Sequence, residues 1–201
     1  MTRQSAGILL YRLTLNATLE VLIVHMGGPF WQRKDEGAWS IPKGEREEGE
    51  EMLTAALREF EEELGSPLPP VRLVALGEIR QSSGKQIVAF AGEGDFDAEN
   101  IHSNTFTMEW PRGSGRQQQF PEIDRAAWVS PEEARVKLAR NQVEFVDRLL
   151  ALLAANASGP ARADPAPALA DPSTPVPTRP ASRGRAPGRV PGQSDEDGRH
   201  G

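Results

Sequence analysis

Residues 44–65 read GEREEGEEMLTAALREFEEELG and contain the strongest periodic pattern in the chain. Apolar side chains recur there at helical spacing, which predicts a core-facing stripe made of Leu53, Ala56, Leu57, Phe60 and Leu64. We therefore predict a helix over residues 50–64. Gly65 follows it and can adopt the left-handed conformation that commonly ends a helix.

Three glutamates lie beside this stripe, Glu59, Glu62 and Glu63. Like charges at this spacing destabilise a helix by about a few tenths of a kcal/mol per pair. No basic residue falls between them, although Arg58 is on their flank. A divalent cation would reverse the repulsion, because Mg²⁺ and Mn²⁺ prefer carboxylate oxygens. The alternative is an acidic helix face turned to solvent.

The full spacing resembles the signature of the Nudix hydrolases, G-x5-E-x7-R-E-U-x-E-E-x-G-U. The matching positions are Gly44, Glu50, Arg58, Glu59, Phe60, Glu62, Glu63 and Gly65. The last aliphatic position of the signature is Ser66 here, which affects local packing more than chemistry.

The resemblance implies a metal-dependent hydrolase of phosphoanhydride bonds. Glu59, Glu62 and Glu63 would then bind Mg²⁺, or Mn²⁺ in its place, with help from the Gly44 carbonyl. Arg58 belongs to the catalytic set by its place in the motif, and we expect it to position the loop and the helix rather than to react.

The general base is left open between a helix glutamate and an acid near the last strand. Some Nudix enzymes use a glutamate on a loop before a late strand, and Glu122 lies at a similar place before Trp128. Asp124 is the local competitor, and both acids could simply face solvent.

Three further residues are candidates for substrate contact. Trp31 and Lys34 lie in a glycine-rich loop over residues 26–38, where a ring and a cation can reach a ligand. A loop tryptophan can equally cover the edge of the core. Lys43 directly precedes Gly44 and can pair with a phosphate oxygen or stay solvated.

Composition sets the wider limits. The 201 residues include no cysteine, which fits a reducing compartment. Their formal net charge is −6, which argues against stable nucleic-acid binding. No apolar run reaches the length of a membrane span, so we expect a cytoplasmic protein. Proline and arginine crowd the end of the chain, so we predict a Nudix domain over residues 1–155 and a disordered tail over 156–201.

Apolar runs before and after the predicted helix read as strands, at residues 6–11, 19–25, 71–79, 86–91, 105–110 and the segment ending at Val129. Ser130-Pro131-Glu132-Glu133 is a strong helix start. This order predicts an α/β protein with a mixed sheet between helices. It agrees with the α/β/α sandwich that the Nudix resemblance implies.

The substrate is less well defined by the sequence. Residues 39–44, WSIPKG, resemble both the diadenosine polyphosphate hydrolases and the diphosphoinositol-polyphosphate group. The stacking tyrosine of the first group has no counterpart at residues 80–83, so Trp31, Phe90, Phe106 or Trp110 would have to stack on a base. We expect a small nucleotide or other diphosphate substrate, with dinucleoside polyphosphates or NTPs favoured. The alternative is a non-catalytic Nudix module that binds nucleotides for regulation. The oligomeric state is left open.

Overall fold

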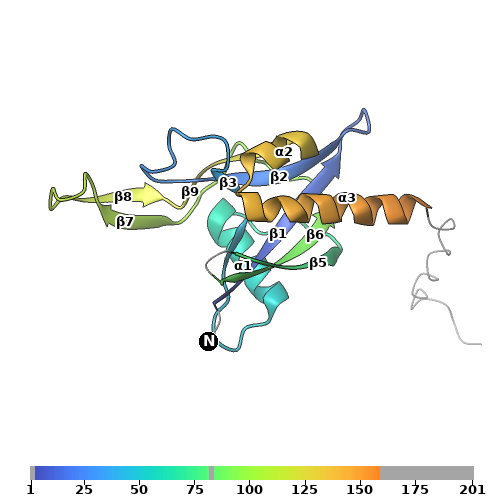
Figure 1. The fold of residues 1–201 in the computed structure, drawn as a ribbon, viewed down its shortest axis with the longest axis horizontal. Helices are drawn as coiled ribbons and strands as arrows, with labels where there is room; N and C mark the ends of the chain where they lie inside the picture. The colour runs from blue at the N-terminus through green and yellow to red at the C-terminus, as the bar shows by residue number, and fades with distance from the viewer. Residues whose placement is uncertain (1–2, 82–83, 159–201) are drawn as a thin grey trace, which may run out of the picture. The chain divides into compact units, whose positions relative to one another are not determined.

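A mixed sheet forms the centre of the structure, a computed structural model that describes residues 3–81 and 84–158 (Figure 1). Its strands are β1 (Gln4–Leu13), β2 (Leu19–Met26), β3 (Trp39–Ser40), β4 (Lys43–Glu45), β5 (Leu73–Arg80), β6 (Gln86–Glu93) and β9 (Ile123–Val129). The strand order is β3-β2-β1-β6-β5, while β4 pairs with β1 and β9 pairs with β2. The β1–β6 pair is parallel and the other pairs are antiparallel, which confirms the predicted mixed sheet.

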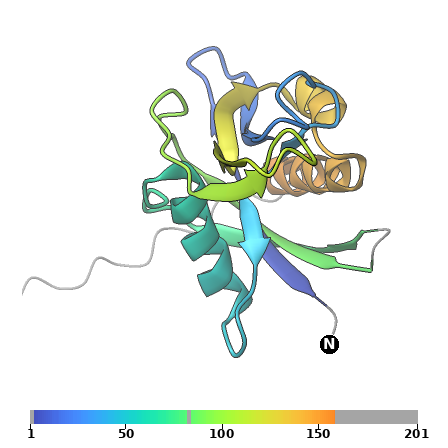
Figure 2. The same cartoon turned by 90° about the vertical axis from the view of Figure 1, so that its left-hand side faces the viewer.

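Helices cover both faces of this sheet. They are α1 (Met52–Leu64), α2 (Pro131–Lys137) and α3 (Val143–Ser158), with a short 3-10 helix at Arg140–Gln142. Alternate residues of β1 face opposite sides, so Ile8 packs with Phe60 of α1 while Leu9 packs in the cluster that contains Phe145 of α3. Figure 2 shows α1 and α3 on opposite sides of the strands. The predicted α/β/α fold is therefore confirmed.

Helix α1 presents a different face to the core from the one predicted. Ala56, Phe60 and Leu64 are fully buried as expected, but Leu53 and Leu57 are 41% and 39% exposed. Ala55 is buried instead. At 100° per residue, the arc from Ala55 to Phe60 contains the positions of Glu59 and Glu63. The predicted stripe was wrong at its edge because the helix is rotated toward its acidic side.

The helix boundaries follow local chemistry. Gly65 has φ 75°, the left-handed conformation predicted for the end of α1, and its N–H donates to the Glu61 carbonyl. Ser130 and Glu133 form the predicted capping box at the start of α2. Helix α1 begins at Met52, two residues later than predicted, because residues 46–50 form a loop whose two ends, at Glu45 and Glu50, bind Arg58.

A separate two-stranded sheet projects from the domain. It consists of β7 (Thr105–Glu109) and β8 (Gln117–Pro121), which pair antiparallel and extend to the left in Figure 1. The strand predicted to end at Val129 is β9, and Glu122 lies at the break between β8 and β9. This break places Glu122 where the hairpin meets the main sheet.

The end of the domain differs slightly from the prediction. Helix α3 runs to Ser158, three residues into the segment predicted as the tail. The rest of the predicted tail lies outside the described residues. No helix in the described part of the chain is long and apolar enough to cross a membrane. The cytoplasmic location stays a prediction.

Replacing Phe60 with alanine tests the observed face of α1. The ring is fully buried, so we expect Phe60→Ala to lower the free energy of unfolding by about 3–5 kcal/mol. The matched variant Leu57→Ala, one turn away and 39% exposed, should lower it by about 1 kcal/mol or less. Urea unfolding followed by circular dichroism measures both. Equal losses would show that the predicted stripe, and not the observed face, is buried.

Candidate active site

The close approach of α1 to β4 brings the acids of the motif against the sheet. Gly44 lies in β4 opposite Ala6 of β1. A Cβ atom built on Gly44 would overlap the Glu59 carboxylate, so this carboxylate occupies the space that any other residue would fill. The sequence assigned Gly44 a role through its carbonyl. The structure shows instead a strand residue that must be glycine because a side chain lies against its backbone.

Glu63 is the acid most removed from water. Its Oε2 atom accepts a hydrogen bond of 2.9 Å from the backbone N–H of Lys43. Burial raises the pKa of Glu63 to about 8, the nearby Lys43 lowers it, and the negative charges of Glu59 and Glu122 raise it further. This carboxyl group therefore lacks enough positive charge around it to be ionised at its ordinary pKa.

Glu122 is distant from α1 in the sequence but acts electrostatically on Glu59 and Glu63 of that helix. Its backbone is held at both ends, because Glu122 N–H donates to Asn104 O at 2.8 Å and Gly27 N–H donates to Glu122 O at 2.8 Å. Asn104 N–H in turn donates to Glu62 O at 3.2 Å. The charge of Glu122 raises the pKa of both Glu59 and Glu63, so the three carboxylates share one electrostatic neighbourhood.

Asp124 takes a different position from its competitor Glu122. Its Oδ1 atom lies 2.6 Å from Nδ1 of the buried His25. Nε2 of the same ring bonds the Lys34 carbonyl at 2.8 Å. Asp124 thus helps to hold the loop over residues 26–38, and Glu122 is the acid of this pair that acts on the glutamates of α1.

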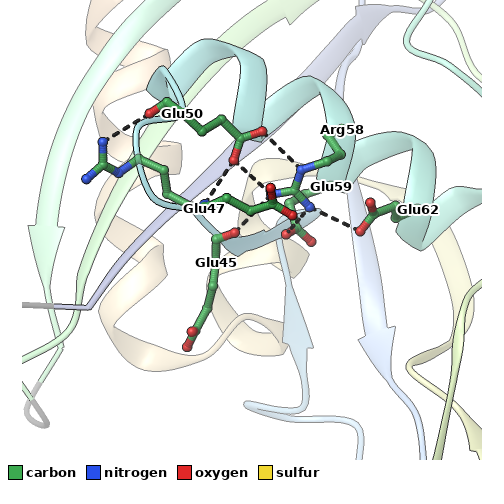
Figure 3. Close-up of polar contacts among 7 residues, drawn as sticks. Glu45, Glu47, Glu50, Arg58, Glu59 and Glu62 are labelled. Atoms are coloured by element: carbon green, nitrogen blue, oxygen red, sulfur yellow. Dashed lines mark hydrogen bonds and ion pairs between the residues drawn. The ribbon is translucent and has the colours of Figure 1, made fainter.

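Arg58 links the helix to the loop that precedes it (Figure 3). Two of its nitrogens donate to the two carboxylate oxygens of Glu50 at 3.0 Å, and Nη2 also donates to the Glu45 carbonyl at 3.0 Å. Hydrogen bonding to Arg58 lowers the pKa of Glu50. The same bond to Glu50 is the largest influence on the pKa of Arg58, which is raised above its ordinary value.

Arg58 also neutralises part of the acidic cluster, which the sequence did not predict. Nη1 lies 2.8 Å from Glu59 and 3.2 Å from Glu62. Figure 3 draws these contacts as dashed lines. The repulsion along α1 is therefore relieved partly by this arginine. Burial nevertheless raises the pKa of Glu59, against the lowering effect of Arg58.

The remaining charge fits a hard divalent cation. Within residues 3–81 and 84–158, no group of three or more His, Cys, Asp or Glu side chains is placed so that it could hold a metal ion. Neither Glu63 nor Glu122 forms an ion pair in that part of the chain, however, and both lie within electrostatic reach of Glu59. An all-oxygen donor set with unbalanced negative charge is the chemistry that Mg²⁺ and Mn²⁺ prefer.

The two loop residues predicted to contact substrate, Trp31 and Lys34, lie against each other. Trp31 is half-buried and packs against the core cluster on the α3 side of the sheet. The Lys34 ammonium lies 4.7 Å from the centre of its ring. Neither side chain forms a hydrogen bond or ion pair with the glutamates in the described ranges. The side chain of Lys43, by contrast, acts electrostatically on Glu63.

Solved structures share this fold. The Caenorhabditis elegans Ap4A hydrolase in a binary complex is 20% identical with a TM-score of 0.53, covering 75% of this chain and 98% of that one. The NUDIX domain of Shewanella oneidensis NrtR, complexed with ADP ribose, is 17% identical with a TM-score of 0.51, covering 76% and 89%. A mutT/nudix family protein from Listeria innocua is 20% identical with a TM-score of 0.52, covering 77% and 95%. At these identities the likeness concerns the fold.

No curated protein matches this chain. The NUDIX domain model, however, matches residues 1–149, which is most of the chain and includes every acid described above. The motif spacing, the mixed sheet between helices and the family model agree, and the chain therefore belongs to the Nudix family of hydrolases.

Proposed function

We propose that the protein is a Mg²⁺-dependent pyrophosphohydrolase that cleaves a phosphoanhydride bond in a nucleoside-diphosphate derivative. The observation that carries this proposal is the half-buried Glu63 carboxyl group, which accepts a hydrogen bond from Lys43 N–H and is under-neutralised beside Glu59 and Glu122. Isolated buried carboxylates are unfavourable unless they are paired or bind a metal. A bound Mg²⁺ would balance the charges of these acids and of a substrate diphosphate.

The residues of the site would divide the work as follows. Glu59, Glu62 and Glu63 would hold the metal with the Gly44 carbonyl, and Arg58 would keep Glu59 and Glu62 oriented. Glu122 is exposed at the junction of β8 and β9, where it can accept a proton from the attacking water. A helix glutamate is the alternative base. Glu63 is less suited to this role, because its raised pKa keeps it largely protonated at neutral pH without metal.

A dinucleoside polyphosphate or an NTP is the favoured substrate. The shared fold with the C. elegans Ap4A hydrolase supports the first class, and the shared fold with the NrtR domain, which was solved with ADP ribose, supports other nucleoside diphosphate derivatives as candidates. A panel of Ap4A, dGTP, 8-oxo-dGTP, ADP-ribose and an inositol pyrophosphate with Mg²⁺, resolved by anion exchange, distinguishes these classes. Binding without turnover of any of them would favour the regulatory module.

Glu63→Gln tests the metal site. This change keeps the size of the side chain but removes a charged ligand, so we expect kcat to fall by about 100-fold or more. The affinity for Mn²⁺, measured by calorimetry, should fall as well. Glu61→Gln is the matched control, because Glu61 is exposed on the same helix and makes the same change of charge. Full activity of Glu63→Gln would remove Glu63 from the set of ligands.

Gly44→Ala tests the close approach of Glu59 to β4. The added Cβ would displace the carboxylate, and a misplacement of about 1 Å can lower kcat by about 100-fold. The control is Gly49→Ala in the loop between β4 and α1, where an added Cβ meets no atom within 4 Å and only the backbone φ of 78° is unfavourable for alanine. Steady-state rates of both variants should separate the loss of a glycine from the loss of this contact. Similar rates for the two variants would contradict the role given to Gly44.

The metal-free protein should lose stability as the pH rises from about 5 to about 8. The pKa of Glu63 is about 8 in the folded state and near its ordinary value when unfolded, so in this window the folded state holds a proton that the unfolded state has released. Glu63→Gln removes this contribution. Between pH 5 and pH 8, the free energy of unfolding of wild type should therefore fall by over about 1 kcal/mol more than that of the variant. Urea unfolding in EDTA measures the difference. A parallel decline in both proteins would show that Glu63 ionises normally.

A further inference from the structure

The β7–β8 hairpin and the loop beneath it form one projecting unit, which we call the arm and define as residues 28–34 and 105–121. The two parts pack through aromatic side chains. The ring of Phe106 lies so close to Gly28 that an added Cβ there would be 2.9 Å from it. Further out, the rings of Phe30 and Trp110 meet edge to face with their centres 5.3 Å apart. The arm is therefore built from both segments together.

The arm gathers exposed cations that have no acidic partner. They are Arg33, Lys34, Arg112 and Arg116, and none forms an ion pair within residues 3–81 and 84–158. The Arg112 guanidinium lies 5.0 Å from the centre of the Phe30 ring. Glu109, the acid of the hairpin, instead accepts a hydrogen bond of 2.6 Å from Gly115 N–H. Free positive charge is concentrated here in a chain whose net charge is −6.

The arm begins at the proposed active site. Pro121 ends β8 directly before Glu122, and the hydrogen bond from Gly27 N–H to Glu122 O joins the start of the loop to the same residue. A strand of five residues spans about 17 Å, so the outer end of the hairpin lies roughly that far from Glu122. Figure 1 shows the hairpin and the loop extending from the same side of the domain.

We propose that the arm binds the second nucleotide of a dinucleoside polyphosphate, the one remote from the acids of α1. This rests on the proposed function and names the substrate class of that same site. Arginines recognise phosphate oxygens, and an exposed aromatic ring stacks on a nucleobase. Phe30 is 42% exposed and lies beneath Arg112, which offers both contacts at one place. A mononucleotide held at the acids has no second nucleotide to fill this surface.

The test compares Ap4A with ATP as substrates of the full chain. Arg112→Ala combined with Arg116→Ala, and separately Phe30→Ala, should raise KM for Ap4A about 10-fold, because stacking and phosphate contacts are lost. The kcat for Ap4A and the KM for ATP should change less than about twofold. Arg80→Ala is the matched control, an exposed arginine on the edge strand β5 outside the arm. Thermal unfolding of every variant should match wild type.

Binding without turnover separates this proposal from the proposed function. In EDTA, the quenching of tryptophan fluorescence by Ap4A should weaken about 10-fold in the arm variants and stay unchanged in Arg80→Ala. If wild type hydrolyses neither compound but binds Ap4A more tightly than the arm variants do, the proposed activity is wrong and the proposed role of the arm is supported. If the arm variants bind and cleave Ap4A as wild type does, or lose Ap4A and ATP equally, the arm does not bind a second nucleotide.

Discussion

The contact between the Glu59 carboxylate and the bare backbone of Gly44 is the constraint on which the rest of the site depends. It requires helix α1 to turn its acidic side toward β4, and therefore leaves Leu57 exposed. Phe60 and Leu64 still fill the core from the same helix. One element thus carries both the packing of this face of the sheet and the acids, which explains why the acids are held firmly and partly out of water.

The electrostatic balance of the site is divided between two kinds of acid. Glu50, Glu59 and Glu62 share Arg58, which relieves their mutual repulsion and ties the loop to the helix. Glu63 and Glu122 have no such partner in the described part of the chain. The arginine therefore positions the cluster and neutralises part of it, but leaves Glu63 and Glu122 without an ion pair in the described residues. The unbalanced part is where a cation and the phosphates of a substrate would meet.

The surroundings of this cluster come from segments distant in sequence. The loop before β3 and the β7–β8 hairpin meet through Gly28 and Phe106, and both lead to Glu122. His25 fixes the other end of the loop, because one nitrogen of its ring bonds the Lys34 carbonyl and the other bonds Asp124. The proposed base and the proposed arm are consequently parts of one supported junction, so substrate binding and proton transfer would depend on the same backbone contacts.

The sequence alone determined the family, the helix that carries the acids and the mixed sheet, because regular spacing and apolar periodicity are local properties of the chain. It could also nominate Glu122. Tertiary structure decided which side of α1 is buried, why position 44 is glycine, and that Arg58 pairs with Glu59 and Glu62. The contact between the rings of Phe30 and Trp110 is also seen only in the tertiary structure. These features depend on the rotation of a helix and the meeting of distant backbones, which no local pattern specifies.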